Sequence, residues 1–157
     1  MNKKKETKLY RAVYKEHQTN PLPSHSKSGR FHTEATGKHT TYLAESADTA
    51  WKEVTYRWKA DPNSYCMVEV MVELTKIIDL TDPSIQKKYG VDASLLIGED
   101  YGPCQKIAAL LRAEGVEAIR TFSKAHSADG RQLVVFLDCL AKGSHVRVHR
   151  SRQLSGD

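Results

Sequence analysis

Hydrophobic and polar positions alternate most regularly between residues 65 and 74, and this pattern predicts a β-strand. Successive side chains of a strand point to opposite faces, so the apolar residues Val68, Val70, Val72 and Leu74 would share one face. Shorter segments with the same β-branched and aromatic character predict five further strands. These are residues 8–14, 40–44, 77–80, 116–122 and 132–140.

Apolar residues recur instead at spacings of three and four over residues 47–59, which predicts an amphipathic helix. Ser46 can cap the N-terminus of this helix, and Pro62 would prevent its continuation. Two more helices are predicted over residues 83–90 and 103–115, because each begins at a proline and ends at a glycine. Strands and helices without a regular β-α-β alternation indicate an α+β fold: a single domain with a mixed β-sheet core and flanking helices.

The composition is that of an ordinary globular domain: of 157 residues, 39% are hydrophobic and 27% are charged. The net charge of +5 lies at the two ends of the chain. Residues 1–8 hold four lysines and one glutamate, and residues 142–157 hold a lysine, three arginines and an aspartate. This leaves 16 basic and 17 acidic side chains in between. We therefore expect residues 8–141 to form the folded domain, and residues 1–7 and 142–157 to be solvated basic tails.

Several functional classes find no support in the sequence. No apolar run approaches the roughly 20 residues that cross a bilayer, and the lysine-rich N-terminus lacks the apolar stretch of a secretion signal. We therefore expect a cytoplasmic protein that does not enter a membrane. Three cysteines and seven histidines at no zinc-binding spacing predict that no metal is bound. The phosphate-binding and nucleophile motifs of the commonest enzyme classes do not occur.

Several short motifs follow one another in an informative order. They are Tyr10-Arg11; Gly29-Arg30-Phe31; Tyr42-Leu43-Ala44-Glu45-Ser46; Glu53; Tyr101, Gln105, Ala108 and Gly115; Phe122-Ser123; and Val134-Val135-Phe136. In this order the chain resembles the RES domain family, which is named after an arginine, a glutamate and a serine. The resemblance covers roughly residues 8–140. Each motif alone is weak, but their order and spacing together are fairly specific.

The resemblance implies a fold similar to that of ADP-ribosyltransferases, with NAD⁺ as the substrate and no bound cofactor. RES proteins typically act as toxins of toxin–antitoxin pairs, and they deplete NAD⁺ by hydrolysis or phosphorolysis of its nicotinamide–ribose bond. Their usual partner is an Xre-like helical antitoxin that plugs the active site. Any contact with nucleic acid would then be made through the antitoxin.

The resemblance also implies which residues carry this chemistry. Arg11 and Arg30 would bind the dianionic pyrophosphate of NAD⁺, because a guanidinium group donates two parallel hydrogen bonds to such a group. Tyr42 would stack on the cationic nicotinamide ring. Glu53, with Arg11 beside it in the catalytic centre, would stabilise the positive charge that develops on the ribose as nicotinamide leaves. Ser123 would hold the nicotinamide ribose or amide.

Several alternatives stay open. Ser127 competes with Ser123 for the role of the site serine. Phe31 and His32 replace the Trp and Asn that are usual in the family, which leaves the contribution of Arg30 open. The acceptor of the ADP-ribosyl group can be water, phosphate or a protein side chain, and in the last case the chain would be a mono-ADP-ribosyltransferase. A hypothesis of another class is a nucleic-acid-binding module that uses the basic tails.

Overall fold

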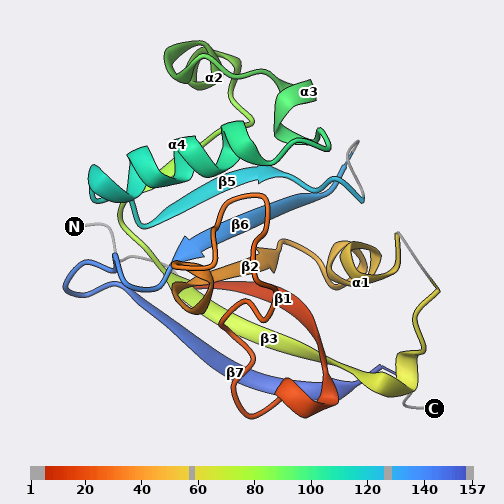
Figure 1. Ribbon diagram of the computed structural model, residues 1–157. Coiled ribbons are helices and arrows are strands. Elements are labelled where there is room, and N and C mark those ends of the chain that lie inside the picture. The colour runs from red at the N-terminus through yellow and green to blue at the C-terminus, as the bar shows by residue number, and fades with distance from the viewer. Residues whose placement is uncertain (1–5, 57–58, 126–128, 155–157) are drawn as a thin grey trace.

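The computed structural model describes residues 6–56, 59–125 and 129–154. In these residues seven strands form one sheet, in the order β4-β5-β6-β2-β1-β3-β7 (Figure 1). The strands are β1 (Thr7–Tyr14), β2 (Thr40–Ala44), β3 (Tyr65–Glu73), β4 (Ile77–Asp79), β5 (Ala118–Phe122), β6 (Arg131–Phe136) and β7 (His145–Gln153). The α-helices are α1 (Ala47–Thr55), α2 (Pro83–Tyr89), α3 (Ala93–Leu96) and α4 (Gly102–Ala113), and the 3-10 helices are η1 (Lys15–His17), η2 (Gly37–His39) and η3 (Pro62–Ser64). Neighbouring strands are antiparallel except β4 and β5, which are parallel, so the predicted α+β fold with a mixed sheet is confirmed.

The sheet is almost divided between β1 and β2. Within these two described strands, Tyr10 opposite Ala44 is the single residue pair in register. By contrast, β1 pairs with β3 along its whole length, and β2 pairs with β6 over all of its residues. The strands β1, β3 and β7 therefore form one half of the sheet, and β2, β6, β5 and β4 form the other.

Apolar side chains from both halves meet in one buried cluster. Leu9 and Val68 from the first half belong to it together with Leu43 and Val135 from the second. A second cluster lies between α4 and the strands β5 and β6, and Figure 1 shows α4 lying along β5 with α2 and α3 beyond it. The helix α1 packs on β1 and β2 through a third, smaller cluster. It therefore lies at the place where the two halves of the sheet separate.

The predicted helix over residues 47–59 is shorter than expected. It begins at Ala47 after the expected cap, because the Ser46 side chain accepts a hydrogen bond from the Thr49 amide at 3.1 Å. It ends at Thr55, and residues 57 and 58 lie outside the described residues. The helix is thus two and a half turns long, which is enough to carry Glu53 in its last turn.

The expectation that residues 142–157 form a solvated tail is wrong. Residues 145–153 form β7, which lies along the free edge of β3 (Figure 1). Arg150 and Arg152 also pair with the buried carboxylate of Glu69, at 3.0 and 3.8 Å. A run of exposed basic residues becomes a strand here because β3 offers both an open backbone edge and a buried acidic partner. The folded domain therefore continues through β7.

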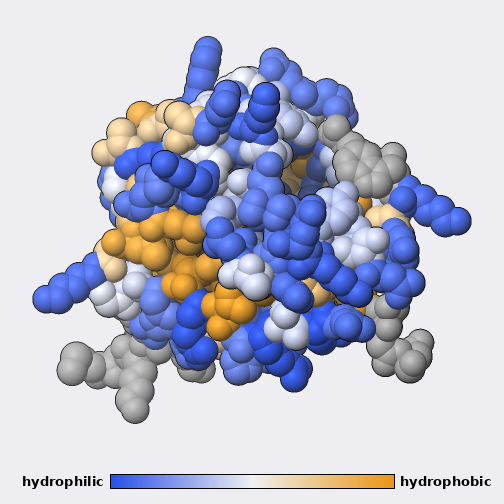
Figure 2. All heavy atoms as spheres, turned by 60° about the horizontal axis from the view of Figure 1, so that its bottom comes forward, coloured by the Kyte–Doolittle hydropathy of each residue, from blue (hydrophilic) through white to orange (hydrophobic). Residues whose placement is uncertain are grey.

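The surface on the side of β7 is mainly hydrophilic, and hydrophobic residues gather there in one area left of the centre (Figure 2). None of the helices in the described ranges combines the length and the apolarity that a membrane-spanning segment needs. Those ranges also contain no group of three or more histidine, cysteine, aspartate or glutamate side chains arranged to hold a metal ion.

Candidate active site

Arg11 lies on β1, at the place where the two halves of the sheet separate. Its guanidinium group donates hydrogen bonds to the carbonyl oxygens of Tyr42 (3.1 Å) and Pro23 (3.4 Å). Its Nε atom is buried without a hydrogen-bond partner. Burial lowers the pKa of Arg11 to about 10, so the group is still a cation at neutral pH. When an anion binds beside a partly buried cation whose contacts are carbonyl oxygens, the attraction between the two charges stabilises the cation.

Arg30 belongs to a closed loop of residues 29–32, the Arg30 loop. Gly29 and His32 form an isolated β-bridge across the loop. The side-chain amide of Gln105 on α4 donates hydrogen bonds to the carbonyl oxygens of both residues, at 2.9 and 3.1 Å. Position 29 requires glycine, because a Cβ atom there would collide with the ring of His32. The loop is therefore fixed to α4.

The Arg30 side chain is itself buried and fixed. Its guanidinium group donates a hydrogen bond to the carbonyl oxygen of Gly98 at 2.7 Å and lies 4.7 Å from the centre of the Tyr101 ring. The neighbouring Phe31 is fully buried in the cluster under α4. Arg30 is thus not a solvated surface arginine, although Phe31 stands where the family usually has Trp.

The hydroxyl of Tyr42 joins strand β2 to the Arg30 loop. It accepts a hydrogen bond from the Phe31 amide (2.9 Å) and contacts Nδ1 of His32 (2.8 Å). The other ring nitrogen of His32 faces the carbonyl oxygen of Ser26 at 3.3 Å and must carry the proton, so Tyr42 donates to Nδ1. Burial lowers the pKa of His32 and raises that of Tyr42, which keeps both groups neutral. His32 therefore takes part in fixing the loop.

Glu53 projects from α1 toward the same region. Its carboxylate accepts a hydrogen bond from the hydroxyl of Ser123, which is fully buried just after β5. Burial raises the pKa of Glu53, and the Ser123 hydrogen bond and the charge of Arg30 oppose this rise. The Ser123 side chain has no exposed surface, and its hydrogen-bond partner in the structure is Glu53. A contact between Ser123 and NAD⁺ stays a prediction. Ser127 lies outside the described residues.

Two adjoining cavities open around these side chains. The smaller cavity has a volume of about 240 Å³ and the larger cavity about 500 Å³. Five residues line both of them, so the cavities meet there: Arg11, Ala12, Tyr42, Glu53 and Val54. Arg30 lines the smaller cavity. The structure thus brings four of the predicted site residues to one cleft and connects the fifth, Ser123, through Glu53.

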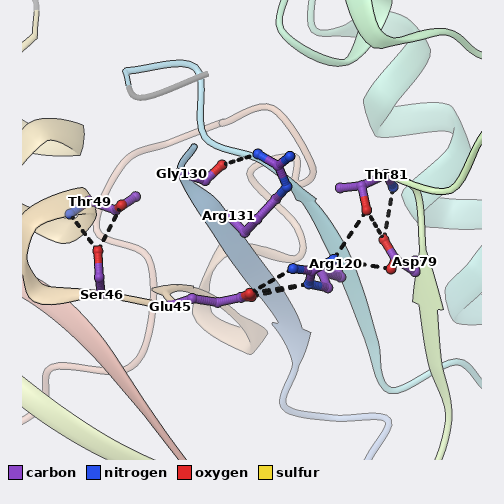
Figure 3. Close-up of polar contacts among 8 residues, drawn as sticks. All are labelled: Glu45, Ser46, Thr49, Asp79, Thr81, Arg120, Gly130 and Arg131. Atoms are coloured by element: carbon purple, nitrogen blue, oxygen red, sulfur yellow. Dashed lines mark hydrogen bonds and ion pairs between the residues drawn. The ribbon is translucent and has the colours of Figure 1, made fainter. Parts of the chain in front are cut away.

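Glu45 and Ser46, which neighbour the site in the sequence, have structural roles (Figure 3). Arg120 on β5 binds the Glu45 carboxylate at 2.9 Å and that of Asp79 at 3.2 Å. Glu45 lines a different surface groove. Ser46 caps α1 by accepting the amide hydrogen of Thr49, as predicted.

Sequence reasoning gave no roles to several residues of the cleft. Gln105 and Tyr101 belong to the motifs of the RES family resemblance, but the motifs do not reveal that these residues hold the Arg30 loop and its arginine. Lys124 and Gln132 also line the smaller cavity. Four further residues of the larger cavity are the aromatic side chains Tyr14, His17, His25 and Tyr65. For His17 and His25 the available signal is the long polar segment between β1 and β2, since loops of that length are often functional.

These features define a class of protein: a single α+β domain with a cleft that holds a partly buried arginine, a buried arginine and a carboxylate. The family model of the RES domain matches residues 8–155, and the chain belongs to the RES domain family. A chain in the crystal structure of the M. tuberculosis MbcT–MbcA toxin–antitoxin complex has the same fold, with a TM-score of 0.77 and 19% sequence identity. The similarity covers 96% of this chain and 85% of that chain. No curated protein sequence matches the chain.

Proposed function

We propose that this protein cleaves the nicotinamide–ribose bond of NAD⁺ and acts as the toxin of a toxin–antitoxin pair. The observation that carries the proposal is the position of Glu53. It is a partly buried carboxylate, held by Ser123, at the junction of two cavities that Arg11 and Tyr42 also line. The resemblance to the RES family implies the same substrate.

The proposed reaction needs a negative charge at this position. When the bond between ribose C1′ and the ring nitrogen breaks, its electron pair leaves with the ring as neutral nicotinamide, and positive charge develops on the ribose. A fixed carboxylate lowers the energy of this state more than that of the bound substrate, and so accelerates the reaction. Glu53 must be ionised to do this. Nicotinamide is a good leaving group, so no general acid is required.

The two arginines suit the middle of the substrate. The pyrophosphate of NAD⁺ carries two negative charges, and the guanidinium groups of Arg11 and Arg30 are both bonded to carbonyl oxygens. Binding of the dianion would compensate the charge of these buried groups. No bound cofactor is required, because NAD⁺ is the substrate.

The reaction ends with one of three acceptors. Water gives ADP-ribose and releases a proton, and phosphate gives ADP-ribose 1-phosphate. A protein side chain would give a mono-ADP-ribosylated protein. All three share the same first half, so the same residues serve each of them.

We also propose that an antitoxin covers the cleft, and that it is an Xre-like helical protein through which any contact with nucleic acid is made. The fold is shared with a chain of a toxin–antitoxin complex, which supports a partner of this class. The alternative of a nucleic-acid-binding module is weakened by β7, where Arg147 pairs with Glu6 at 3.1 Å and Arg150 with Glu69 at 3.0 Å. These basic side chains already have acidic partners within the chain.

A direct test incubates the purified chain with NAD⁺, with and without phosphate, and identifies the products by mass spectrometry. Wild type should release nicotinamide, and Glu53→Gln should lower kcat by about 10²–10³-fold. Glu45→Gln is the matched control, since it removes a nearby carboxylate that pairs with Arg120 outside the cleft. The proposal is refuted if the wild-type protein does not cleave NAD⁺, or if Glu53→Gln cleaves it as fast as the wild type. Label retained on protein would identify a protein acceptor.

A further inference from the structure

Four aromatic side chains form a connected row along the larger cavity, the aromatic row Tyr65, Tyr14, His17 and His25. Tyr14 stacks on Tyr65, with 4.6 Å between ring centres and 25° between ring planes. His17 meets Tyr14 edge to face at 6.3 Å, and His25 stacks on His17 at 3.7 Å with an 8° interplanar angle. Together with the shared Tyr42, this row gives the larger cavity a lining suited to a planar ring.

The two cavities also differ in charge. In the smaller cavity, the cations Arg30 and Lys124 are added to Arg11, against the single carboxylate Glu53. In the larger cavity, Arg11 is opposed by Glu53 and by Glu16. The smaller cavity is therefore positively charged, and the larger cavity is not.

Lys124, Arg30 and His25 contribute unequally to the charge of the two cavities. Lys124 also pairs with the exposed carboxylate of Glu99, so Arg30 is the more effective cation of the smaller cavity. Arg30 is buried and bonded to a carbonyl oxygen, which leaves its charge uncompensated by that contact. Burial and the neighbouring His17 lower the pKa of His25, so the His25 ring adds no charge to the larger cavity at neutral pH.

NAD⁺ has a matching division of charge, with a pyridinium cation at one end and a pyrophosphate dianion in its middle. We infer that the nicotinamide ring occupies the larger cavity against the aromatic row, while the pyrophosphate lies in the smaller cavity beside Arg30. The nicotinamide ribose then lies at the junction, next to Glu53. This orientation rests on the proposed function.

Charge and size both favour this orientation of NAD⁺. Aromatic faces attract a cation within about 6 Å, whereas Arg30 and Lys124 would repel one. The dianion has the opposite preference. Size agrees with this division, because the smaller cavity of about 240 Å³ lies below the range of roughly 300–1,000 Å³ typical of sites for whole ligands. The smaller cavity is therefore suited to a part of NAD⁺ and not to the whole molecule.

The test uses two halves of the substrate as competitive inhibitors of NAD⁺ cleavage. Nicotinamide mononucleotide contains the pyridinium ring, and ADP-ribose lacks it. Tyr14→Leu removes an aromatic face from the row, and Tyr14→Phe keeps it. Leu110→Ala is the control, because Leu110 is 49% exposed, much as Tyr14 is 45% exposed, and it lines neither of the two cavities.

Tyr14→Leu should raise the inhibition constant of nicotinamide mononucleotide about fivefold, which corresponds to about 1 kcal/mol for a cation over an aromatic ring. It should leave the constant of ADP-ribose unchanged. Tyr14→Phe and Leu110→Ala should leave the constant of nicotinamide mononucleotide at the wild-type value.

If Tyr14→Leu instead weakens ADP-ribose alone, adenine occupies the larger cavity and the inferred orientation is reversed. If it weakens neither inhibitor, the aromatic row does not bind the ring. Both results refute the orientation and leave the proposed function intact, because NAD⁺ is still cleaved. A wild-type protein that neither binds nor cleaves NAD⁺ refutes both.

Discussion

Replacing Ser123 with alanine would remove the hydrogen bond that its hydroxyl donates to the Glu53 carboxylate. Ser123 is fully buried just after β5, and alanine would leave a space of one oxygen atom. The carboxylate would lose a donor that favours its ionised form. The pKa of Glu53, which burial already raises, should therefore rise further.

A hydrogen bond to a charged group contributes about 1.5–3 kcal/mol, which is roughly a factor of ten or more in an equilibrium constant. Because the proposed reaction needs ionised Glu53, the loss of activity in Ser123→Ala should depend on pH. At high pH both proteins hold an ionised carboxylate, and the difference in kcat/KM should be small. As the pH falls through the pKa of Glu53, the variant is protonated first, and it should become about tenfold or more slower than wild type.

The measurement is the pH profile of kcat/KM for NAD⁺, taken over the range in which both proteins stay folded. Ser46→Ala is a suitable control, because Ser46 caps the helix that carries Glu53 but does not contact the carboxylate. That variant should lose activity by the same factor at every pH. If Ser123→Ala also shows a constant ratio to wild type, Ser123 acts on the position of Glu53 and not on its charge, and the reasoning fails.

Two further predictions concern stability. The raised pKa of Glu53 means that the folded chain binds a proton more tightly than the unfolded chain, so ionisation costs stability as the pH rises from about 4.5. Glu53→Gln should therefore raise Tm at neutral pH by about 2–4 °C, and calorimetry should find no gain in acid. Glu117 is the opposite case, because its buried carboxylate accepts three main-chain amide hydrogens at 2.7–2.9 Å and its pKa is lowered to about 2. Glu117→Ala should lower the free energy of unfolding by about 3 kcal/mol in urea, with the exposed Glu114→Ala as control. This contribution is complete above about pH 4.5 and is lost as the pH falls toward 2, so an equal deficit at every pH would contradict it.

Much of the fold was predictable because its signals are local. The cap at Ser46, the proline that begins α2 and the glycine with positive φ that ends it at position 90 are all set by residues within one or two turns. The alternation over residues 65–74 likewise predicts β3, whose apolar face is buried. In each case the information that fixes the element lies inside the element.

The parts of the fold and of the site that the sequence does not predict depend mainly on contacts between distant segments. Apolar and polar residues alternate in β7 only over Val146-Arg147-Val148, which is too short to predict a strand. The strand forms because Glu69 and the edge of β3 provide partners about 80 residues away. α3 is only four residues long, too short for a helical period to be recognised. Gln105 holds the Arg30 loop over more than 70 positions, and nothing near either segment predicts the other.

A comparison of the arginines of the chain supports the proposal that the cleft binds an anion. Arg112 binds the carboxylate of Asp138, and Arg120 binds Glu45 and Asp79, so these cations have acidic partners. Arg11 and Arg30 are hydrogen-bonded to carbonyl oxygens instead, and burial of a cation that makes no ion pair is unfavourable. A structural role would be served better by a paired arginine or by an apolar residue. The presence of two such cations, beside a carboxylate whose pKa is raised by burial, is explained if a ligand brings the negative charge that pairs with them. In the proposed function, the pyrophosphate of NAD⁺ supplies this negative charge.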